Sequence, residues 1–436
     1  NIASVINNSD SAALSATIAY KDNLYVERGR VTKSIAANEK RDFIVNDMGL
    51  VPNTYGTVCV TTDATEDGAW AGGVTIYKPN MRLVQRAFGT SFDGALYEPF
   101  RNPRDGSFSL PLNTFHIGSN ASSTVANWIS ITDGTPGDSK GLSGTLNYRN
   151  SEGGILKTER VSMPDGGRFD FGGHDAIGMD AAGNAQFIPD DLTNKYYYYA
   201  TRYIYDCPGA SCDDLLTAYV IPSRPALKTS MFSGVTTTEN ELAFAELVNF
   251  SQTMAVVEVK AYKGDGTLAG TERIGIPAHG TRHAFISKFG NAGFLDIGET
   301  GYAQINVIQG EVSAHALFYK VVDGVLQYAY AAEFRNRAAT IKRSQFNSFI
   351  DHTNTPIAHN TSASSVSVTV DFITTSNLVS QRQSIGIPAF GSYRFDTSNI
   401  PSDTYGTIIV QAGHENVILS NYLRRSNEYT IPFPSE

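Results

Sequence analysis

The side chains in this sequence that could carry out chemistry are a few histidines and aspartates. His279 and His283 stand four residues apart, which is the spacing of a helical zinc-binding pair. Their neighbours predict a turn and a strand, however, where the two rings would not share a face. His174-Asp175 lies in a glycine-rich stretch but has no evident partner nucleophile. We therefore expect no metal site and no catalytic dyad at these histidines.

Clustered aspartates could supply oxygen ligands to calcium. The candidates are Asp133 with Asp138, and the group Asp206, Asp213 and Asp214. Neither group has the alternating ligand spacing of an EF-hand, and aspartate before glycine is common in turns. We also expect no nucleophile elbow and no phosphate-cradling glycine loop. The sequence thus predicts a protein that is not an enzyme and needs no cofactor, with calcium binding left open.

A pattern that occurs four times is the main feature of the chain, and residues 241–334 show it most clearly. Polarity alternates with a period near two, and Gly, Asp and Asn mark the breaks, as in consecutive antiparallel strands. An asparagine turn recurs at Asn7, Asn120, Asn249 and Asn360. Further repeated segments are Ile35–Glu39, Met163–Gly167, Ile276–Gly280 and Ile387–Gly391, and the closing tyrosines Tyr77, Tyr203, Tyr319 and Tyr422. A repeat of this kind must be settled before any fold is assigned.

The repeats predict an all-β protein of four tandem antiparallel β-sandwich modules. We place module 1 at 1–96, module 2 with inserted loops at 113–223, module 3 at 240–334 and module 4 at 346–436. Residues 97–112, 224–239 and 335–345 are then expected as extended connectors. Few residues precede Asn7, so module 1 is expected to have a shortened first strand and a neighbouring strand with an unpaired edge.

Composition restricts the partners of the chain. The formal net charge is −9 with no block of Lys or Arg, which argues against a nucleic-acid partner because phosphate contacts need a basic footprint. No apolar run approaches the roughly 20 residues that span a bilayer. The sequence begins with Asn1, so we expect a secretion signal to have been removed and the protein to be extracellular or on a cell surface.

Cysteines and sequons agree with an exported protein. Cys207 and Cys212 bracket a short hairpin tip and are expected to form a disulfide, as is common outside the cytosol. Cys59 aligns with Ile409 and is expected to fill the core. The sequons at Asn7, Asn120, Asn249 and Asn360 could accept glycans, but asparagine in a repeated turn also satisfies its own backbone. Both alternatives stay open, with the turn favoured.

Aromatic side chains are candidates for contacts with a ligand or another subunit. Tyr197, Tyr199, Tyr203 and Tyr205 would share one face of a strand, while Tyr196 and Tyr198 would face the opposite side. One of these faces must be core. The other could stack on a sugar or pack against a connector or a neighbouring subunit. In the connectors and their borders, the corresponding candidates are Phe100, Phe115, Phe346 and Phe349.

The asparagine turns, the Ile-Pro-Ala-x-Gly segments and the Tyr-Gly-Thr strands resemble the tandem immunoglobulin-like β-sandwich repeats of bacterial or archaeal surface and filament proteins. The resemblance covers nearly the whole chain and implies an exported structural or adhesive role. We accordingly expect a subunit of a filament or surface layer that associates with itself through strand edges and connectors. The alternative is a carbohydrate-binding adhesin that uses the tyrosines with Trp70 or Trp128.

Overall fold

The structure is a computed structural model that describes residues 2–51, 54–65, 69–79, 87–92, 106–115, 123–206, 214–336, 341–349, 351–374, 379–413, 415–425 and 429–433. Strands dominate these residues and form eight antiparallel sheets. The helical elements are short, namely the 3-10 turn η1 (Val45–Met48) and helix α2 (His174–Ile177). No helix among the described residues has the length and apolar character needed to cross a bilayer. The prediction of an all-β fold with tandem sandwich modules is confirmed.

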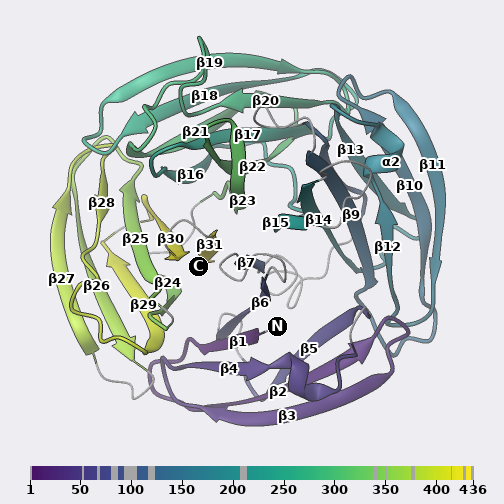
Figure 1. Cartoon of the computed structure of the whole chain (residues 1–436), viewed down its shortest axis with the longest axis horizontal. Coiled ribbons are helices and arrows are strands. Elements are labelled where there is room, and N and C mark those ends of the chain that lie inside the picture. The colour runs from purple at the N-terminus through teal and green to yellow at the C-terminus, as the bar shows by residue number, and fades with distance from the viewer. Residues whose placement is uncertain are drawn as a thin grey trace.

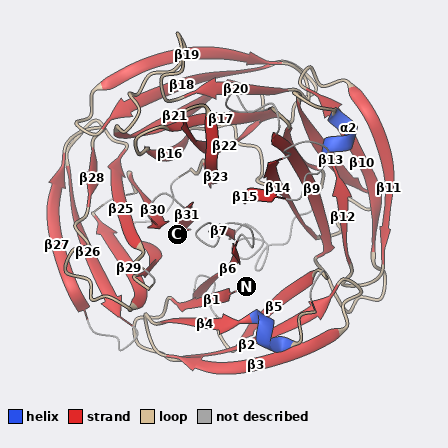
Figure 2. Cartoon of the chain, viewed as in Figure 1, coloured by secondary structure: helices blue, strands red, loops and turns tan. Residues whose placement is uncertain are grey.

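Each module pairs an outer sheet at the rim with an inner sheet nearer the centre of the molecule (Figures 1 and 2). Module 1 consists of β1 (Ile2–Asn7), β2 (Leu14–Asp22), β3 (Glu27–Ile35), β4 (Lys40–Ile44), β5 (Gly56–Thr62), β6 (Trp70–Pro79) and β7 (Ala87–Phe92). Module 2 consists of β8 (Phe108–Asn113), β9 (Ser123–Asp133), β10 (Leu142–Asn150), β11 (Ile155–Met163), β12 (Arg168–Gly172), β13 (Ala182–Pro189), β14 (Tyr196–Asp206) and β15 (Asp214–Pro222).

Modules 3 and 4 repeat the topology of module 2 strand for strand. Module 3 consists of β16 (Met231–Thr236), β17 (Glu241–Asn249), β18 (Ala255–Lys263), β19 (Leu268–Ile276), β20 (Thr281–Phe285), β21 (Thr300–Gln309), β22 (Val312–Val322) and β23 (Val325–Glu333). Module 4 consists of β24 (Ile341–Asn347), β25 (Thr353–Asn360), β26 (Val366–Thr374), β27 (Val379–Ile387), β28 (Ser392–Arg394), β29 (Tyr405–Ala412), β30 (Val417–Arg425) and β31 (Tyr429–Phe433).

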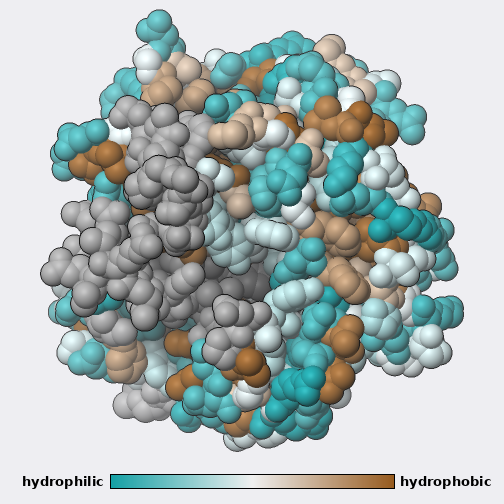
Figure 3. All heavy atoms as spheres, turned by 45° about the vertical axis from the view of Figure 1, so that its right-hand side comes forward, coloured by the Kyte–Doolittle hydropathy of each residue, from teal (hydrophilic) through white to brown (hydrophobic). Residues whose placement is uncertain are grey.

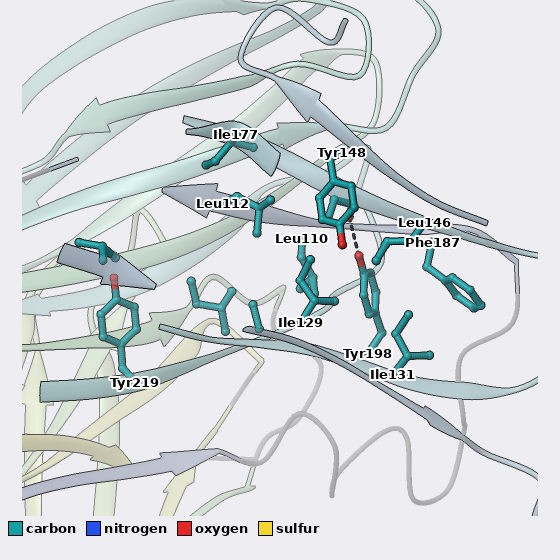
Figure 4. Packing of buried hydrophobic residues seen from close by; sticks show 14 of the residues in the cluster. Leu110, Leu112, Ile129, Ile131, Leu146, Tyr148, Ile177, Phe187, Tyr198 and Tyr219 are labelled. Carbon is teal, nitrogen blue, oxygen red and sulfur yellow. Dashed lines mark hydrogen bonds between the residues drawn. The ribbon is translucent and has the colours of Figure 1, made fainter. Parts of the chain in front are cut away.

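Alternating side chains build the core of each sandwich. In module 2, Leu146 and Tyr148 of β10 point inward together with Phe187 of β13, and they meet Ile131 and Tyr198 from the inner sheet (Figure 4). The Tyr198 hydroxyl donates a 2.7 Å hydrogen bond to the carbonyl of Ala185, which satisfies the polar end of a buried ring. This burial of apolar area is the main force that holds the two sheets together.

One glycine occupies the same place in the outer sheet of every module. It is Gly56 on β5, Gly183 on β13, Gly301 on β21 and Gly406 on β29. A Cβ atom at any of these positions would lie 2.0–2.1 Å from a carbonyl oxygen of the neighbouring strand, next to a bulge that all four modules share. Only glycine permits so close a backbone approach.

The modules form a closed ring, which the sequence did not predict (Figure 1). The last strand of each module contacts the next in the order β7, β15, β23, β31 and back to β7. One hydrophobic core runs from module 2 into module 3 and another from module 3 into module 4, whereas the core of module 1 is separate. The chain is therefore a compact circle of sandwiches, not a string of domains held apart by linkers.

The segments expected as connectors contain the first strand of modules 2, 3 and 4. These strands are β8, β16 and β24, and each forms one edge of its outer sheet. Module 1 differs, because its outer sheet has only β3, β2 and β5 among the described residues. The strands that correspond to β5 in the other modules are β13, β21 and β29. Each of them pairs with the first strand of its own module. The sequence predicts an unpaired edge next to the strand before Asn7, but that strand, β1, pairs with both β4 and β6. Among the described residues the open edge of the outer sheet is instead that of β5.

Candidate functional site

The contacts between consecutive modules, here called joints, follow one plan. In modules 2, 3 and 4 the residue after the Ile-Pro-Ala-x-Gly-type turn donates its backbone N–H to a hairpin of the preceding module. In order around the ring, these donors and acceptors are Arg168 to Asn23 (3.0 Å), Thr281 to Ser151 (2.9 Å) and Ser392 to Gly264 (2.8 Å). The repeated segments found in the sequence thus connect neighbouring modules.

A first strand fills the joint between modules 3 and 4 and the joint between modules 2 and 3. In joint 3–4, the Tyr422 hydroxyl donates to the carbonyl of Gly234 on β16 at 3.0 Å, and Arg424 donates to Thr236 O at 2.8 Å. In joint 2–3, Asn113 at the end of β8 donates to Glu246 of module 3 at 2.9 Å. In both joints the first strand of one module is held by the inner sheet of the next.

Joint 1–2 contains a cavity of about 480 Å³ instead of a first strand. On one side it is lined by β5 together with Tyr25 and Tyr55 of module 1, and on the other by Arg168, Tyr197 and Tyr199 of module 2. Because this lining combines an open strand edge with aromatic side chains, the cavity is the candidate functional site.

The open edge of β5 presents backbone hydrogen-bonding groups to this cavity. Asp63 donates its N–H to Ser15 O on the β2 side at 3.2 Å. Since the direction of backbone groups alternates along a strand, Thr61, Cys59 and Thr57 bond toward β2. The N–H and C=O groups of Val58 and Val60 then point away from β2, into the joint. Farther along this edge, the carbonyl of Gly56 accepts a 2.6 Å hydrogen bond from Arg168 Nη1, which supports this assignment.

Arg168 determines the charge distribution at the cavity. Its guanidinium forms two 3.0 Å hydrogen bonds with the Asp170 carboxylate and lies 5.3 Å and 5.5 Å from the ring centroids of Tyr55 and Tyr199. Burial raises the pKa of Tyr203, at the same wall, to about 12. Of the two carboxylates that line the cavity, Asp170 is thus paired with Arg168 and Asp133 accepts backbone N–H groups of Gly166 and Thr135, while Tyr203 keeps its proton at neutral pH. This chemistry suits binding better than proton transfer.

Cys59 lies half-buried on β5 and not in the core of the module. Its Sγ is 3.9 Å from the Tyr25 hydroxyl, and burial raises the pKa of the thiol, which keeps it in the unreactive protonated form. It was expected to be a core residue because it aligns with Ile409, which is buried. Ile409 itself lies outside the core cluster of module 4, which contains its neighbours Ile408 and Val410. The shared position is therefore on the face of the strand that points away from the core.

The tyrosines of β14 divide as their alternation predicts. Tyr196 and Tyr198 are buried in the core of module 2, while Tyr197, Tyr199 and Tyr203 line the cavity. The proposed contact face is therefore directed at joint 1–2.

The phenylalanine candidates do not lie together. Phe115 is 40% exposed and its ring centroid lies 5.9 Å from that of His283, across joint 2–3. Phe349 is 37% exposed and packs against Tyr405 at 6.0 Å. Phe346, in contrast, is fully buried in the core of module 4, so it is no surface contact. Phe100 lies outside the described residues.

The two tryptophans also differ. Trp70 is buried in module 1, whereas Trp128 is 40% exposed and packs edge-on against His174 at 5.6 Å. Neither tryptophan is among the residues that line the cavity. A sugar platform that combines them with Tyr197 and Tyr199 is therefore not assembled at joint 1–2.

The asparagine turn has the same geometry in modules 1, 3 and 4. Asn249, for example, donates from Nδ2 to the carbonyls of Thr253, Ile276 and Pro277 at 2.8, 3.2 and 2.8 Å and accepts from Ser251 N at 2.8 Å. Asn7 and Asn360 make the corresponding bonds and are equally buried. A glycan on Nδ2 would have to displace these bonds.

In module 2 the equivalent residue is Asp133, not Asn120. Asp133 ends β9 as Asn249 ends β17, and its N–H donates to Gly167 O as that of Asn249 donates to Gly280 O. Asn120 precedes β9 and lies outside the described residues. The alignment of module 2 was therefore shifted, because a sequon occurs before the strand and the true turn carries aspartate.

Asp133, Asp138 and Asp165 bring one carboxylate oxygen each within 4.8 Å of one another. These oxygens accept backbone hydrogen bonds, including Gly166 N to Asp133 at 2.8 Å and Gly137 N to Asp165 at 2.7 Å. The cluster is thus accounted for as turn chemistry. In the other acidic group considered for calcium, Asp213 lies outside the described residues.

The histidine pair is not assembled as a metal site. His279 occupies a left-handed turn position with φ of 54°, and its carbonyl accepts from Asn184. His283 instead lies 3.2 Å from Glu246 Oε1. Cys207 and Cys212 lie outside the described residues, so their disulfide remains a prediction.

One sequence match was missed. Gly137-Asp138-Ser139-Lys140-Gly141 has the Gly-x-Ser-x-Gly spacing of a nucleophile elbow. In the structure it is an exposed loop between β9 and β10, without the strand-to-helix turn that an elbow requires. An unpaired edge in module 1 was predicted, though not at β5, whereas Arg168 and the cavity were missed because they depend on contacts between modules.

Comparisons with known proteins give no family for the chain. No protein-family model matches it, and no curated protein matches it. Among solved structures, an isomalto-dextranase of Arthrobacter globiformis T6 complexed with panose shares 13% identity over 48% of this chain and 34% of that one, with a TM-score of 0.16. A glycosyl hydrolase family 2 member from Bacteroides cellulosilyticus shares 6% identity over 53% and 29%, with a TM-score of 0.12.

A β-glucuronidase of Ruminococcus gnavus is a further match, with 8% identity over 54% of this chain and 35% of that one and a TM-score of 0.12. This chain therefore spans about a third of the length of these enzymes. Overlaps this weak carry no argument about function.

Proposed function

We propose that the protein is a non-enzymatic extracellular structural subunit that joins its neighbours into a filament or surface layer through the open edge of β5. The observation that carries this proposal is the outer sheet of module 1, in which β5 has one described partner where β13, β21 and β29 each have two. A strand edge with unpaired backbone groups is a template for another chain.

The strands at the other edge of each outer sheet, which are β3, β11, β19 and β27, support this choice because they differ from β5. Charged side chains occupy them, namely Arg28 and Arg30 on β3, Lys157 and Arg160 on β11, Glu272 and Arg273 on β19, and Arg382 on β27. Charges on an edge strand discourage pairing, whereas β5 reads Gly-Thr-Val-Cys-Val-Thr-Thr without a charge. On the face shown in Figure 3, the hydrophobic side chains form separate small patches among hydrophilic ones. Edge pairing is therefore a better mode of assembly than a broad apolar face.

Negative-stain electron microscopy of purified protein at increasing concentration tests this proposal. We expect single rings at low concentration and linear or layered arrays at high concentration. The matched control is Val58→Pro, which removes one outward N–H without touching the ladder to β2, and it should remain as single rings. Wild-type rings that stay single at every concentration would count against the role.

A second candidate is carbohydrate binding at the same cavity, favoured by its tyrosine lining. Aromatic rings stack on the apolar faces of sugars, and Arg168 with Asp170 offers hydrogen bonds to hydroxyls. A glycan array with wild-type protein and a Tyr197→Ala variant tests this candidate. Binding that the substitution abolishes would support an adhesin.

A further inference from the structure

We infer that the occupant of joint 1–2 is an extended peptide strand that lies antiparallel to β5 and places a large apolar side chain opposite Gly56. This inference rests on the proposed function and specifies the partner of the same site. It identifies the partner as a polypeptide segment of six or seven residues, the lengths of β8, β16 and β24.

The three sister modules show what such a strand looks like. The residue opposite the repeated glycine is Leu112 in module 2, Val235 in module 3 and Phe346 in module 4. All three side chains are fully buried. The Phe346 ring lies so close to Gly406 that a Cβ there would be 2.7 Å from it. At Gly183 and Gly301 the nearest side chains are instead Ile177 and Leu295. The feature common to the three strands is therefore a buried apolar residue in register with the glycine, and in module 4 its ring packs directly over the glycine.

Gly56 has the same backbone surroundings as these glycines, so module 1 has the same place for such a side chain. It is held against Lys21 O as Gly406 is held against Ile373 O, and it follows the same bulge. Along the strand, Val58 is half-buried whereas its counterpart Ile408 is fully buried. The inner side of β5 thus retains apolar area that a fourth strand would cover, with a gain of about 25 cal/mol per Å² buried.

The opposite wall of the cavity also corresponds to a surface that binds a strand elsewhere in the ring. Thr132, Thr201 and Tyr203 occupy the register positions that His359, Tyr422 and Arg424 hold in module 4. Those three residues of module 4 contact β16 in joint 3–4. The wall of module 2 therefore presents to joint 1–2 the same register positions that contact a strand in joint 3–4.

The direction and hydrogen bonding of the strand follow from the same templates. β8, β16 and β24 all run antiparallel to their partners. The incoming strand would bond to the outward N–H and C=O groups of Val58 and Val60, which supply main-chain affinity, while the side chain over Gly56 fixes the register.

Synthetic peptides test this inference on the full chain. The probe is a fluorescein-labelled peptide with the sequence Ile341–Asn347 of β24, since β29 resembles β5 most closely in sequence. We expect saturable binding to one site, measured by fluorescence anisotropy. A peptide with Phe346→Ser and the protein variant Val58→Pro should each weaken binding by about tenfold or more, the equivalent of one lost buried contact.

Hydrogen exchange on the wild type provides a readout that needs no variant. The amides of Val58 and Val60 should exchange more slowly when the peptide is bound, and those of β29 should not change. Failure of the peptides from β8, β16 and β24 to bind, or protection elsewhere than β5, would overturn the inference. Peptide binding without arrays in the microscope would retain the inference and reject the proposed function. Arrays that form and are not inhibited by the β24 peptide would retain the proposed structural role and reject the inference.

Discussion

Asn249 links a strand end to the turn that follows it by three side-chain hydrogen bonds, and Asn7 and Asn360 do the same in their modules. Each amide satisfies buried carbonyls that would otherwise lack donors. The repetition of this residue therefore has a structural cause, which a sequon pattern alone does not reveal. Asp133 replaces it in module 2, where Gly166 N turns toward the side chain and donates to it.

Replacing Asn249 should reveal the value of these bonds. We expect Asn249→Ala to lower the free energy of unfolding by about 2–3 kcal/mol, because several buried carbonyls lose their donor. Asn249→Asp should cost more at neutral pH, since a carboxylate would face three carbonyl oxygens. Urea denaturation followed by intrinsic fluorescence measures both. Ser251→Ala removes the sequon and keeps the amide but loses the 2.9 Å hydrogen bond from Glu311 N to Ser251 Oγ, so we expect a smaller loss there, and a loss as large as that of Asn249→Ala would contradict this account.

His359 should make stability depend on pH. It is fully buried, its Nδ1 lies 2.8 Å from the Ser392 hydroxyl, and burial lowers its pKa to about 3. The unfolded chain binds a proton near pH 6.5, so the stability that neutral His359 supports is present above that pH and declines as the pH falls toward 3. The expected slope is about 1.4 kcal/mol per pH unit.

Melting temperatures from pH 7 to pH 4.5 check this expectation. Another buried histidine responds in the same range, namely His315, whose pKa burial lowers to about 4, so the informative quantity is the difference between wild type and His359→Asn. The variant should show a shallower decline. Parallel curves would mean that His359 does not titrate in this range.

At the scale of elements, β8 and β16 are the strands that fill the joints between neighbouring modules. They were expected as connectors because they lie between the repeated segments, and Pro111 in β8 and Gly234 in β16 interrupt any strand pattern there. Their burial comes from both their own sheet and the next module, so no alternation of polarity marks them. The strands in the middle of each module were predicted, because one face of each is core.

Joint 2–3 also contains a buried ion pair between β14 of module 2 and β17 of module 3. Arg202 and Glu246 are fully buried and form two hydrogen bonds at 2.9 and 2.7 Å. Burial raises the pKa of Glu246, but Arg202 and His283 outweigh it and hold the carboxyl well below its usual range. Removing one partner would leave an uncompensated charge inside the joint.

We therefore expect Glu246→Leu to destabilise the protein by about 3–5 kcal/mol. The double substitution Arg202→Met with Glu246→Leu should recover much of that loss, because no buried charge remains unpaired. Guanidinium denaturation of the two variants and the wild type makes the comparison. If the double variant is no more stable than Glu246→Leu, the hydrogen bonds and packing of these two side chains, and not only their charges, hold the joint together.

On the scale of the whole molecule, the cores predict how the ring unfolds. Modules 2, 3 and 4 share hydrophobic clusters, while module 1 has its own smaller cluster and an outer sheet of three described strands. We expect module 1 to unfold at a lower temperature than the rest, giving two transitions in differential scanning calorimetry. The peptide from β24 should raise the first transition and leave the second unchanged. A single transition unaffected by the peptide would show that the ring unfolds as one unit.

The number and type of modules could be predicted from the sequence, but their closure could not. Repeats report what each module contains, whereas the ring depends on which faces meet. Those faces are made by residues whose type changes from module to module: Arg168 is Thr281 and Ser392 in modules 3 and 4, and the register position of Tyr422 is held by Thr201 in module 2. An open edge in module 1 was predicted from the residue count before its asparagine turn, though not at β5.

Closure of the circle through β7, β15, β23 and β31 limits how a protein of this design can evolve. An open array can gain or lose a unit at either end at little cost, but a fifth unit here would force every angle between neighbours to change at once. Duplication is therefore expected to stop at this size, and later divergence is confined to loops and to the one position where the circle departs from its own symmetry.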